Sequence, residues 1–424
     1  MPSPVRVLCT GDLHVGRFPS HVSASDRSLS VEAVWDRTVD LALAERVDAV
    51  VLTGDVADQD NKLFEALGPL RTGVARLAAA GVRTVAVSGN HDYDVLRRLA
   101  DLVDADAFTL LGTMGTWTET TLEKEGAPAL RLVGWSFPSR HVRTSPLETF
   151  PDLAPGPPTL GVVHGDLDQA ESDYAPLPRA ALVRPHVSGW LLGHIHRPAF
   201  DRSGGTTTLY PGSPQPLDPG ETGPHGPWLV TVQPSGAVEA HHHPLASVRY
   251  DAVEVDLSDA ENRDGVETAF TSVVDDHLDA VHAVQPDATH VVVDLRAIGR
   301  TTAFAAAAAV AEQIEGREIP GPHATATVRR VVVNARPAYD LEVVAQRNDP
   351  AGAVAQLVLD VERGDAPDLV AEATRSLRAL DGATGLAPLR RDPRPTADPT
   401  VEARERLTAQ GLRLLDSLLA QTAP

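Results

Sequence analysis

The sequence predicts an α/β fold built around a parallel sheet, and two observations support that prediction. Within the first ninety residues, three short apolar runs alternate with two segments of helical periodicity. Strands that are joined in this way by helices form a parallel sheet whose two faces are both covered. Each of the three runs also leads into a glycine beside polar side chains. These polar residues therefore lie at the carboxyl ends of the strands, which is where ligands bind in such sheets.

Two helices are expected between the first three strands. Apolar residues recur at helical spacing over 31–46 and over 63–80, and Gly81 follows the second segment as its expected C-cap. Further short apolar runs predict the strands that complete this domain. We place the strands of the first domain, residues 1–245, at 5–10, 49–53, 83–87, 129–135, 159–163, 190–192, 206–210, 228–232 and 238–243.

The pattern restarts after residue 250 and predicts a small α+β domain over 250–340. Strand-like and helical segments alternate in it, as in a compact module of under a hundred residues. The expected strands are 252–257, 290–295 and 325–335, and the expected helices are 266–283 and 301–315.

Residues 350–424 are predicted to form a helical C-terminal region. The proline- and arginine-rich segment 382–399 indicates a linker within it. The last helix, from Val401 to Gln421, carries a broad leucine-rich face. That face either docks on a partner protein or packs against its own domain, and the sequence leaves both open.

Composition narrows the class of protein. The chain has 424 residues, of which 42% are hydrophobic, and it has one cysteine, Cys9. A single cysteine cannot form an internal disulfide, and there is no apolar run of about 18 residues and no signal-peptide pattern, so we expect a cytoplasmic protein without a membrane span. The net charge of −21 repels nucleic acid, so any binding of nucleic acid requires local positive charge, from metal ions or from a partner.

Five short motifs each follow a predicted strand, and they carry the candidate chemistry. Their side chains are carboxylates, imidazoles and one amide, with no cysteine among them. This mixture suits Mn²⁺, Fe²⁺ or Zn²⁺ in a reactive site and argues against a structural zinc site. The motifs are Asp12-Leu13-His14, Gly54-Asp55, Gly89-Asn90-His91-Asp92, His164-Gly165-Asp166 and Gly193-His194-Ile195-His196.

The spacing within two motifs suggests how they share a metal ion. Asp12 and His14 are two residues apart in a segment that we expect to be extended, so their side chains point to the same side. His194 and His196 repeat this spacing. Taken singly, such residues are more often turn or cap residues than ligands. Five motifs at one predicted sheet edge are hard to explain structurally, whereas the triplet His241-His242-His243 is expected only to end a strand.

In this order the motifs resemble those of calcineurin-like metallophosphoesterases, over residues 5–245. The resemblance implies a four-layer αββα sandwich, followed here by the small α+β domain in the place of a capping domain and by the C-terminal helices. It also implies two divalent metal ions, expected to be Mn²⁺, with Asp55 bridging them. His91 would face the scissile phosphate, oriented by Asp92 or by a backbone carbonyl. The implied ligands are Asp12, His14, Asp55 and His196 for one ion, and Asp55, Asn90, His164 and His194 for the other.

Two further stretches are similar to DNA-repair exonucleases of the SbcD and YhaO type. One is Asp12-Leu13-His14-Val15-Gly16-Arg17, and the other is Tyr210-Pro211-Gly212-Ser213-Pro214-Gln215 followed by Glu221-Thr222-Gly223. This resemblance implies a DNA exonuclease or endonuclease that works in repair with an SMC-like ATPase such as SbcC. Whether the protein forms a homodimer is left open.

One motif departs from the pattern of this group, and two alternative functions are considered. Some members of the group carry Gly-Asp-Leu-Phe-His, whereas this chain has Gly54-Asp55-Val56-Ala57-Asp58, which leaves the balance of exonuclease and endonuclease activity open. The same site would also suit a phosphodiesterase or phosphatase that acts on a small nucleotide. A non-catalytic scaffold is disfavoured because no implied ligand is missing.

Overall fold

The computed structural model describes residues 3–58, 63–382 and 398–422, and the predicted linker 382–399 lies almost wholly outside them. The chain divides into two compact units, which are described one at a time. The first unit comprises Met1–Asp251, His277–Val293 and Glu318–Thr327; the second comprises Ala252–Asp276, Asp294–Arg317 and Val328–Pro424. The three-domain division expected from the sequence stays a prediction.

The first sheet of the first unit has the strand order β12-β11-β1-β2-β3-β4. Its first four strands in sequence are parallel; the sequence predicted the first three of them but not β4. β11 and β12 extend the sheet in antiparallel pairing. The strands are β1 (Val5–Thr10), β2 (Ala49–Leu52), β3 (Arg83–Ala86), β4 (Phe108–Leu110), β11 (Trp228–Val232) and β12 (Val238–His242).

The second sheet has the order β5-β6-β7-β8-β10-β9, with four parallel strands between two antiparallel edges. Its first strand lacks the continuous apolar run of a buried strand, and the sequence did not predict it. The strands are β5 (Trp117–Lys124), β6 (Ala127–Trp135), β7 (Thr159–His164), β8 (Gly189–Gly193), β9 (Ala199–Asp201) and β10 (Thr208–Tyr210).

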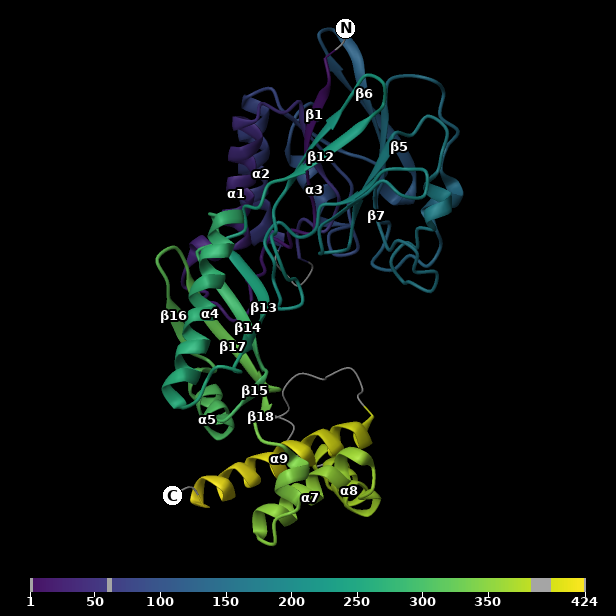
Figure 1. Ribbon diagram of the computed structural model, residues 1–424. Helices are drawn as coiled ribbons and strands as arrows, with labels where there is room; N and C mark the ends of the chain where they lie inside the picture. The colour runs from purple at the N-terminus through teal and green to yellow at the C-terminus, as the bar shows by residue number, and fades with distance from the viewer. Residues whose placement is uncertain (1–2, 59–62, 383–397, 423–424) are drawn as a thin grey trace. The chain divides into compact units, whose positions relative to one another are not determined.

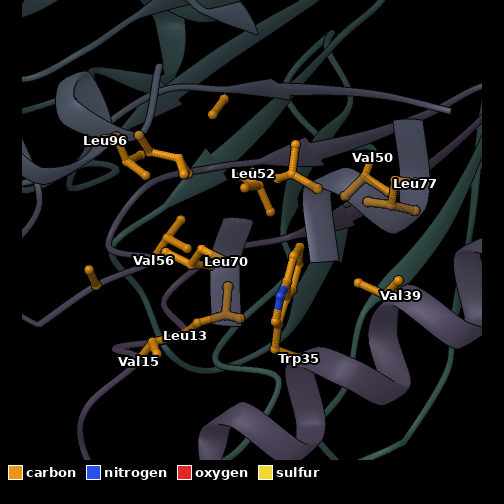
Figure 2. Packing of buried hydrophobic residues seen from close by; sticks show 14 of the residues in the cluster. Leu13, Val15, Trp35, Val39, Val50, Leu52, Val56, Leu70, Leu77 and Leu96 are labelled. Atoms are coloured by element: carbon orange, nitrogen blue, oxygen red, sulfur yellow. The ribbon is translucent and has the colours of Figure 1, made fainter. Parts of the chain in front are cut away.

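Helices cover one face of the first sheet, and the second sheet covers the other (Figure 1). The helices are α1 (Val31–Ala44), α2 (Leu63–Ala79) and the unpredicted α3 (Val95–Leu102). Figure 2 shows Trp35 of α1 packed between the helices and the sheet, where its indole nitrogen donates to the carbonyl of Pro69 at 3.1 Å. A separate apolar cluster fills the space between the two sheets.

The outer face of the second sheet is covered by loops and short 3₁₀ helices instead of a regular helical layer. Leu147 and Leu182 of these helices pack there against Trp190. Prolines at 138, 146, 151, 155, 157 and 158 explain this part of the difference from an αββα sandwich, because proline removes the N–H that a helix interior needs. The 3₁₀ helices of the described chain are η1 (Arg27–Leu29), η2 (Thr113–Gly115), η3 (Pro146–Thr149) and η4 (Arg179–Leu182).

The chain after residue 247 contains a four-stranded sheet, two helices and a helical C-terminal part. The sequence predicted both helices and three of the four strands, but not the strand at Glu318–Pro320. The sheet order is β13-β14-β17-β16, and the boundary between the two units runs through its strands. A second, two-stranded sheet pairs β15 with β18. The elements are β13 (Val248–Asp256), α4 (Arg263–Val284), β14 (His290–Ile298), β15 (Arg300–Thr301), α5 (Phe304–Ile314), β16 (Glu318–Pro320), β17 (Thr325–Val333), β18 (Arg336–Pro337), α6 (Leu341–Ala345), α7 (Pro350–Arg363), α8 (Pro367–Gly382) and α9 (Pro399–Thr422).

The leucine-rich face of α9 packs within its own unit. Leu412 is buried against Val358 of α7, and Leu415 against Ala355 of the same helix. Leu414 points elsewhere and is 53% exposed. Among the helices that the structure describes, none is long and apolar enough to cross a membrane.

Candidate metal centre

The five motifs converge in the first unit at the carboxyl ends of strands from both sheets. Asp12 and His14 follow β1, Asp55 follows β2, and Asn90 and His91 follow β3. His164 ends β7, and His194 and His196 follow β8. In each of three sets, one ligand atom per residue lies within 4.8 Å of the others. The sets are Asp12, His14 and His196; His14, Asp55 and His91; and Asp55, His164 and His194.

The sequence analysis assumed that the segment after β1 is extended, but the structure shows that it is not. Asp12 and His14 have φ angles of 49° and 52°, and Asp55 has 49°, all in the left-handed region. Such a conformation costs a non-glycine residue about 1–2 kcal/mol. Hydrogen bonds between the two loops offset that cost: Asp12 N–H donates to the Gly54 carbonyl at 2.9 Å, and His14 N–H donates to the Asp55 carbonyl at 3.0 Å. The pairing of two loops therefore aims these side chains, and strand alternation does not.

Two glycines make the close packing of the centre possible. A Cβ on Gly89 would lie 2.2 Å from Oδ1 of Asp55, and one on Gly193 would lie 2.1 Å from the carbonyl oxygen of Thr53. Real Cβ atoms do not approach other atoms so closely. The glycines before Asn90 and His194 are therefore required for the two sheet edges to meet around Asp55.

The inner part of the centre joins a carboxylate, an imidazole and an amide. Nε2 of His164 lies 3.3 Å from Oδ2 of Asp55 and 3.2 Å from Oδ1 of Asn90. Nδ1 of His164 donates to the Thr53 carbonyl at 3.0 Å, which leaves the lone pair of Nε2 directed at the two oxygens. Three electron-pair donors that face one another in a buried place suit a bound cation.

The second cluster contains two imidazoles whose Nε2 atoms face each other. These atoms, from His14 and His196, are 3.1 Å apart. Nδ1 of His196 lies 2.9 Å from Oε1 of Glu221, so the proton resides on that nitrogen and Nε2 keeps its lone pair. The carboxylate of Asp12 accepts from the backbone N–H of His194 at 3.0 Å. This set also suits a divalent cation.

The charges of these groups depend strongly on one another. Burial opposes ionisation of Asp55, but neighbouring His164 and two further histidines hold its pKa well below the usual value. For His164, burial opposes protonation, but Asp55 raises its pKa to about 9. Burial likewise opposes protonation of His196, but Glu221 and Asp12 raise its pKa to about 9. Without metal, the centre therefore holds protons where cations would otherwise supply positive charge.

His91 contacts Asp58 and not Asp92, which corrects the role suggested for Asp92. Nδ1 of His91 lies 3.2 Å from Oδ1 of Asp58, and this hydrogen bond, against the opposing effect of burial, raises the pKa of His91. Asp92 is fully buried and accepts from the backbone N–H groups of Val56 and Gly89 at 2.6 and 2.7 Å. Burial, followed by the charge of Asp55, raises the pKa of Asp92 to about 7. Asp92 thus braces two loops and does not orient the ring of His91.

Sequence reasoning assigned no positive role to three carboxylates that contact the histidines. These are Asp58, Asp166, whose Oδ1 lies 3.4 Å from Nε2 of His194, and Glu221. All three stand in stretches that the sequence analysis had noted. No spacing rule links position 58 to 91 or position 221 to 196, so only the fold shows the pairing.

The model of the calcineurin-like phosphoesterase family matches residues 5–198. This range contains all seven implied ligands. Residues 5–198 of this chain form a calcineurin-like phosphoesterase domain. Proteins of this family use two divalent metal ions, and the observed clusters suit them. The calcineurin-like domain is accordingly that of a metal-dependent phosphoesterase, a hydrolase of phosphate esters.

Two curated relatives are similar to this chain at low identity. The uncharacterized metallophosphoesterase YhaO of Bacillus subtilis is 27% identical over 240 residues, which is 56% of this chain and 57% of YhaO. The DNA double-strand break repair protein Mre11 of Haloferax volcanii is 29% identical over 304 residues, which is 71% of this chain and 63% of Mre11. The chain thus spans less than two thirds of either relative. Among solved structures, a dimetal phosphatase from Danio rerio matches at 15% identity and a TM-score of 0.35, over 57% of this chain and 99% of that one.

Proposed function

We propose that this protein is a DNA nuclease with a dinuclear metal centre, an exonuclease or endonuclease that hydrolyses phosphodiester bonds in DNA repair. The convergence of the five motifs around Asp55 carries the proposal of phosphodiester hydrolysis. The similarity to Mre11 favours DNA as the substrate, because it extends over 304 residues and so beyond the 194 residues of the family match, 5–198.

In this proposal the side chains act in the sets that geometry brings together. Asp55 would contribute to both metal positions. Asp12, His14 and His196 would hold one Mn²⁺ ion with it, and Asn90, His164 and His194 would hold the other. When bound, two such ions supply a hydroxide near neutral pH and positive charge for the phosphoryl oxygens. The chain's own part is to hold these side chains in place around the buried Asp55 carboxylate.

His91 is the proposed general acid, and Asp58 is the residue that orients it. The side chain of His91 is 31% exposed at the mouth of the centre, so it can approach a phosphate ester. Its Nδ1–H is engaged by Asp58, which leaves Nε2 for the leaving oxygen. The raised pKa of His91 favours the protonated ring, which can neutralise charge on the phosphate or donate a proton.

We also propose an SMC-like ATPase as the partner of the C-terminal helices. Leu412 and Leu415 are used inside the unit, so the exposed side chains of α9, such as Leu414, are the available contacts. Leu414→Glu should leave the hydrolysis of small phosphodiesters unchanged and impair the activity on duplex DNA in the presence of the ATPase. Equal loss of both activities would show that this position is needed for folding alone.

The test of the nuclease is a comparison of substrates with the purified chain and Mn²⁺. End-labelled linear DNA, bis-p-nitrophenyl phosphate and a cyclic nucleotide are incubated in parallel, beside the variant Asp55→Ala. Shortening of the DNA that the variant lacks supports the nuclease. Cleavage of the cyclic nucleotide alone, unchanged on addition of the ATPase, would instead establish a small-substrate phosphodiesterase. Replacement of Mn²⁺ by Fe²⁺ or Zn²⁺ in the same assay identifies the most effective ion.

A further inference from the structure

Glu221 contacts the centre without belonging to the proposed ligand set. Its Oε1 atom lies 2.9 Å from Nδ1 of His196. A carboxylate only accepts hydrogen bonds, so this contact places the proton of the neutral imidazole on Nδ1. The lone pair of His196 is then on Nε2, the atom that lies 3.1 Å from Nε2 of His14.

The carboxylate of Glu221 is itself held in place. Its Oε2 atom accepts from the hydroxyl of Ser213 at 2.6 Å and from the backbone N–H of Leu217 at 3.1 Å. The side chain of Glu221 is only 12% exposed, and Ser213 is fully buried. Rotation of the carboxylate would therefore break two hydrogen bonds in a place where water cannot readily replace them.

The same segment also grips the backbone of His196. The N–H of Ser213 donates to the His196 carbonyl at 3.0 Å. Gly212, at a φ of 74°, approaches that carbonyl so closely that a Cβ would lie 2.5 Å from its oxygen. The stretch Tyr210–Gln215, with Glu221 after it, thus fixes both the ring and the backbone of one candidate ligand.

His196 and His164, one candidate ligand from each metal position, differ in the group that Nδ1 contacts. Nδ1 of His196 faces a charged carboxylate, whereas Nδ1 of His164 donates to the neutral carbonyl of Thr53. A carboxylate behind an imidazole raises its basicity as a ligand more than a neutral acceptor does. Loss of the charge on Glu221 should therefore affect one metal position and spare the other.

We propose that Glu221 is a positioning residue that holds His196 with Nε2 free for metal and so increases the affinity of the position formed by Asp12, His14 and His196. The proposal rests on the metal centre of the proposed function.

Metal binding to the full chain tests this role without any activity assay. The chelator-treated protein is titrated with Mn²⁺ by calorimetry, as wild type, Glu221→Gln and the control Asp218→Asn. Asp218 is an exposed acid of the same loop that pairs with Arg17 at 3.2 Å and touches no ligand. We expect Glu221→Gln to weaken one of two Mn²⁺ equivalents by about 10- to 100-fold, to leave the other within about twofold, and Asp218→Asn to change neither.

Anomalous diffraction from Mn²⁺-soaked crystals shows which position has lost occupancy in Glu221→Gln. Loss at His14 and His196 supports the proposal; loss at His164 and His194, or equal weakening of both equivalents, overturns it. A wild type that takes up no Mn²⁺ would overturn the proposed function itself. A Glu221→Gln variant that binds both Mn²⁺ equivalents with wild-type affinity would overturn only the role of Glu221.

Ser213→Ala provides a second route if Glu221→Gln does not fold. It keeps the carboxylate but removes one of the two hydrogen bonds that fix it. The same Mn²⁺ equivalent should weaken by a few fold, and Glu221→Asp, which retains the charge, should keep more affinity than Glu221→Gln wherever both fold. An unchanged affinity in Ser213→Ala would count against the positioning role.

Discussion

The inner and outer parts of the metal centre are held by different kinds of contact. Asp55 and His164, on the inside, are at most 2% exposed and contact backbone groups: the N–H of His91 and the carbonyl of Thr53. The outer histidines are 19–31% exposed, and each lies against a carboxylate. These outer pairs are His91 with Asp58, His194 with Asp166, and His196 with Glu221.

The inner contacts are needed for the centre to form, whereas the outer contacts adjust its metal affinity and its rate. The inner contacts involve the backbone of neighbouring strands, so they exist only when both sheets are correctly packed. The outer contacts are between side chains and can be changed one at a time. Substitutions inside should therefore remove the centre, whereas substitutions outside should change its rates and affinities.

The largest effect is expected for Asp55→Ala. This change removes the carboxylate shared by two of the three ligand sets, so binding of both Mn²⁺ ions and hydrolysis of bis-p-nitrophenyl phosphate should be abolished. Metal content per chain and the hydrolysis rate are the measurements. Asp94→Ala, an exposed acid outside the centre, serves as the control. A variant that still bound two ions would refute the bridging role of Asp55.

The next effect is expected for His91→Ala. We expect the rate to fall by about 10²–10⁴-fold, the usual contribution of a general acid, while both Mn²⁺ ions remain bound. The metal content of this variant distinguishes a general acid from a ligand, because one of the possible ligand sets contains His91 with His14 and Asp55. Loss of metal from the variant would place His91 among the ligands. His186→Asn, at an exposed turn, controls for the loss of an imidazole.

A smaller effect is expected for Asp58→Ala. Because Asp58 acts through His91, its removal should slow hydrolysis by roughly tenfold, a part of the contribution of the general acid. The double variant with His91→Ala should be no slower than His91→Ala alone, since the two residues act as one unit. Rates that multiplied in the double variant would mean that Asp58 acts on the centre by another route, such as His14, whose Nδ1 lies 3.9 Å away.

The smallest expected effect is the release of protons from His164 and His196 when Mn²⁺ binds. In the metal-free protein the pKa values of His164 and His196 are raised to about 9, so both rings are protonated at pH 7. Metal ligands must be deprotonated, so Mn²⁺ binding should release protons at pH 7 and tighten as the pH rises toward 9. Calorimetry in two buffers of different ionisation enthalpy measures the release. Equal binding enthalpies in the two buffers would contradict it.

Local sequence pattern was sufficient for the elements that bury continuous apolar runs. β1 and β11 have the expected bounds, and α1, α2 and α9 begin within two residues of the expected positions. It failed for β5, whose side chains are largely exposed on one face, and for the short helix α3. Exposed edges and short helices depend on neighbours for their stability, and those neighbours are far away in the sequence.

The sequence by itself determined the candidate ligands, their order along the chain and the strands that most of them follow, because each depends on a few adjacent residues. Only the tertiary structure decided the left-handed turns at Asp12, His14 and Asp55, the bracing role of Asp92, and the partners of the outer histidines. Glu221 meets His196 across 25 residues and Asp58 meets His91 across 33. Such pairings follow from how two sheet edges and their loops pack together, and no local periodicity contains that information.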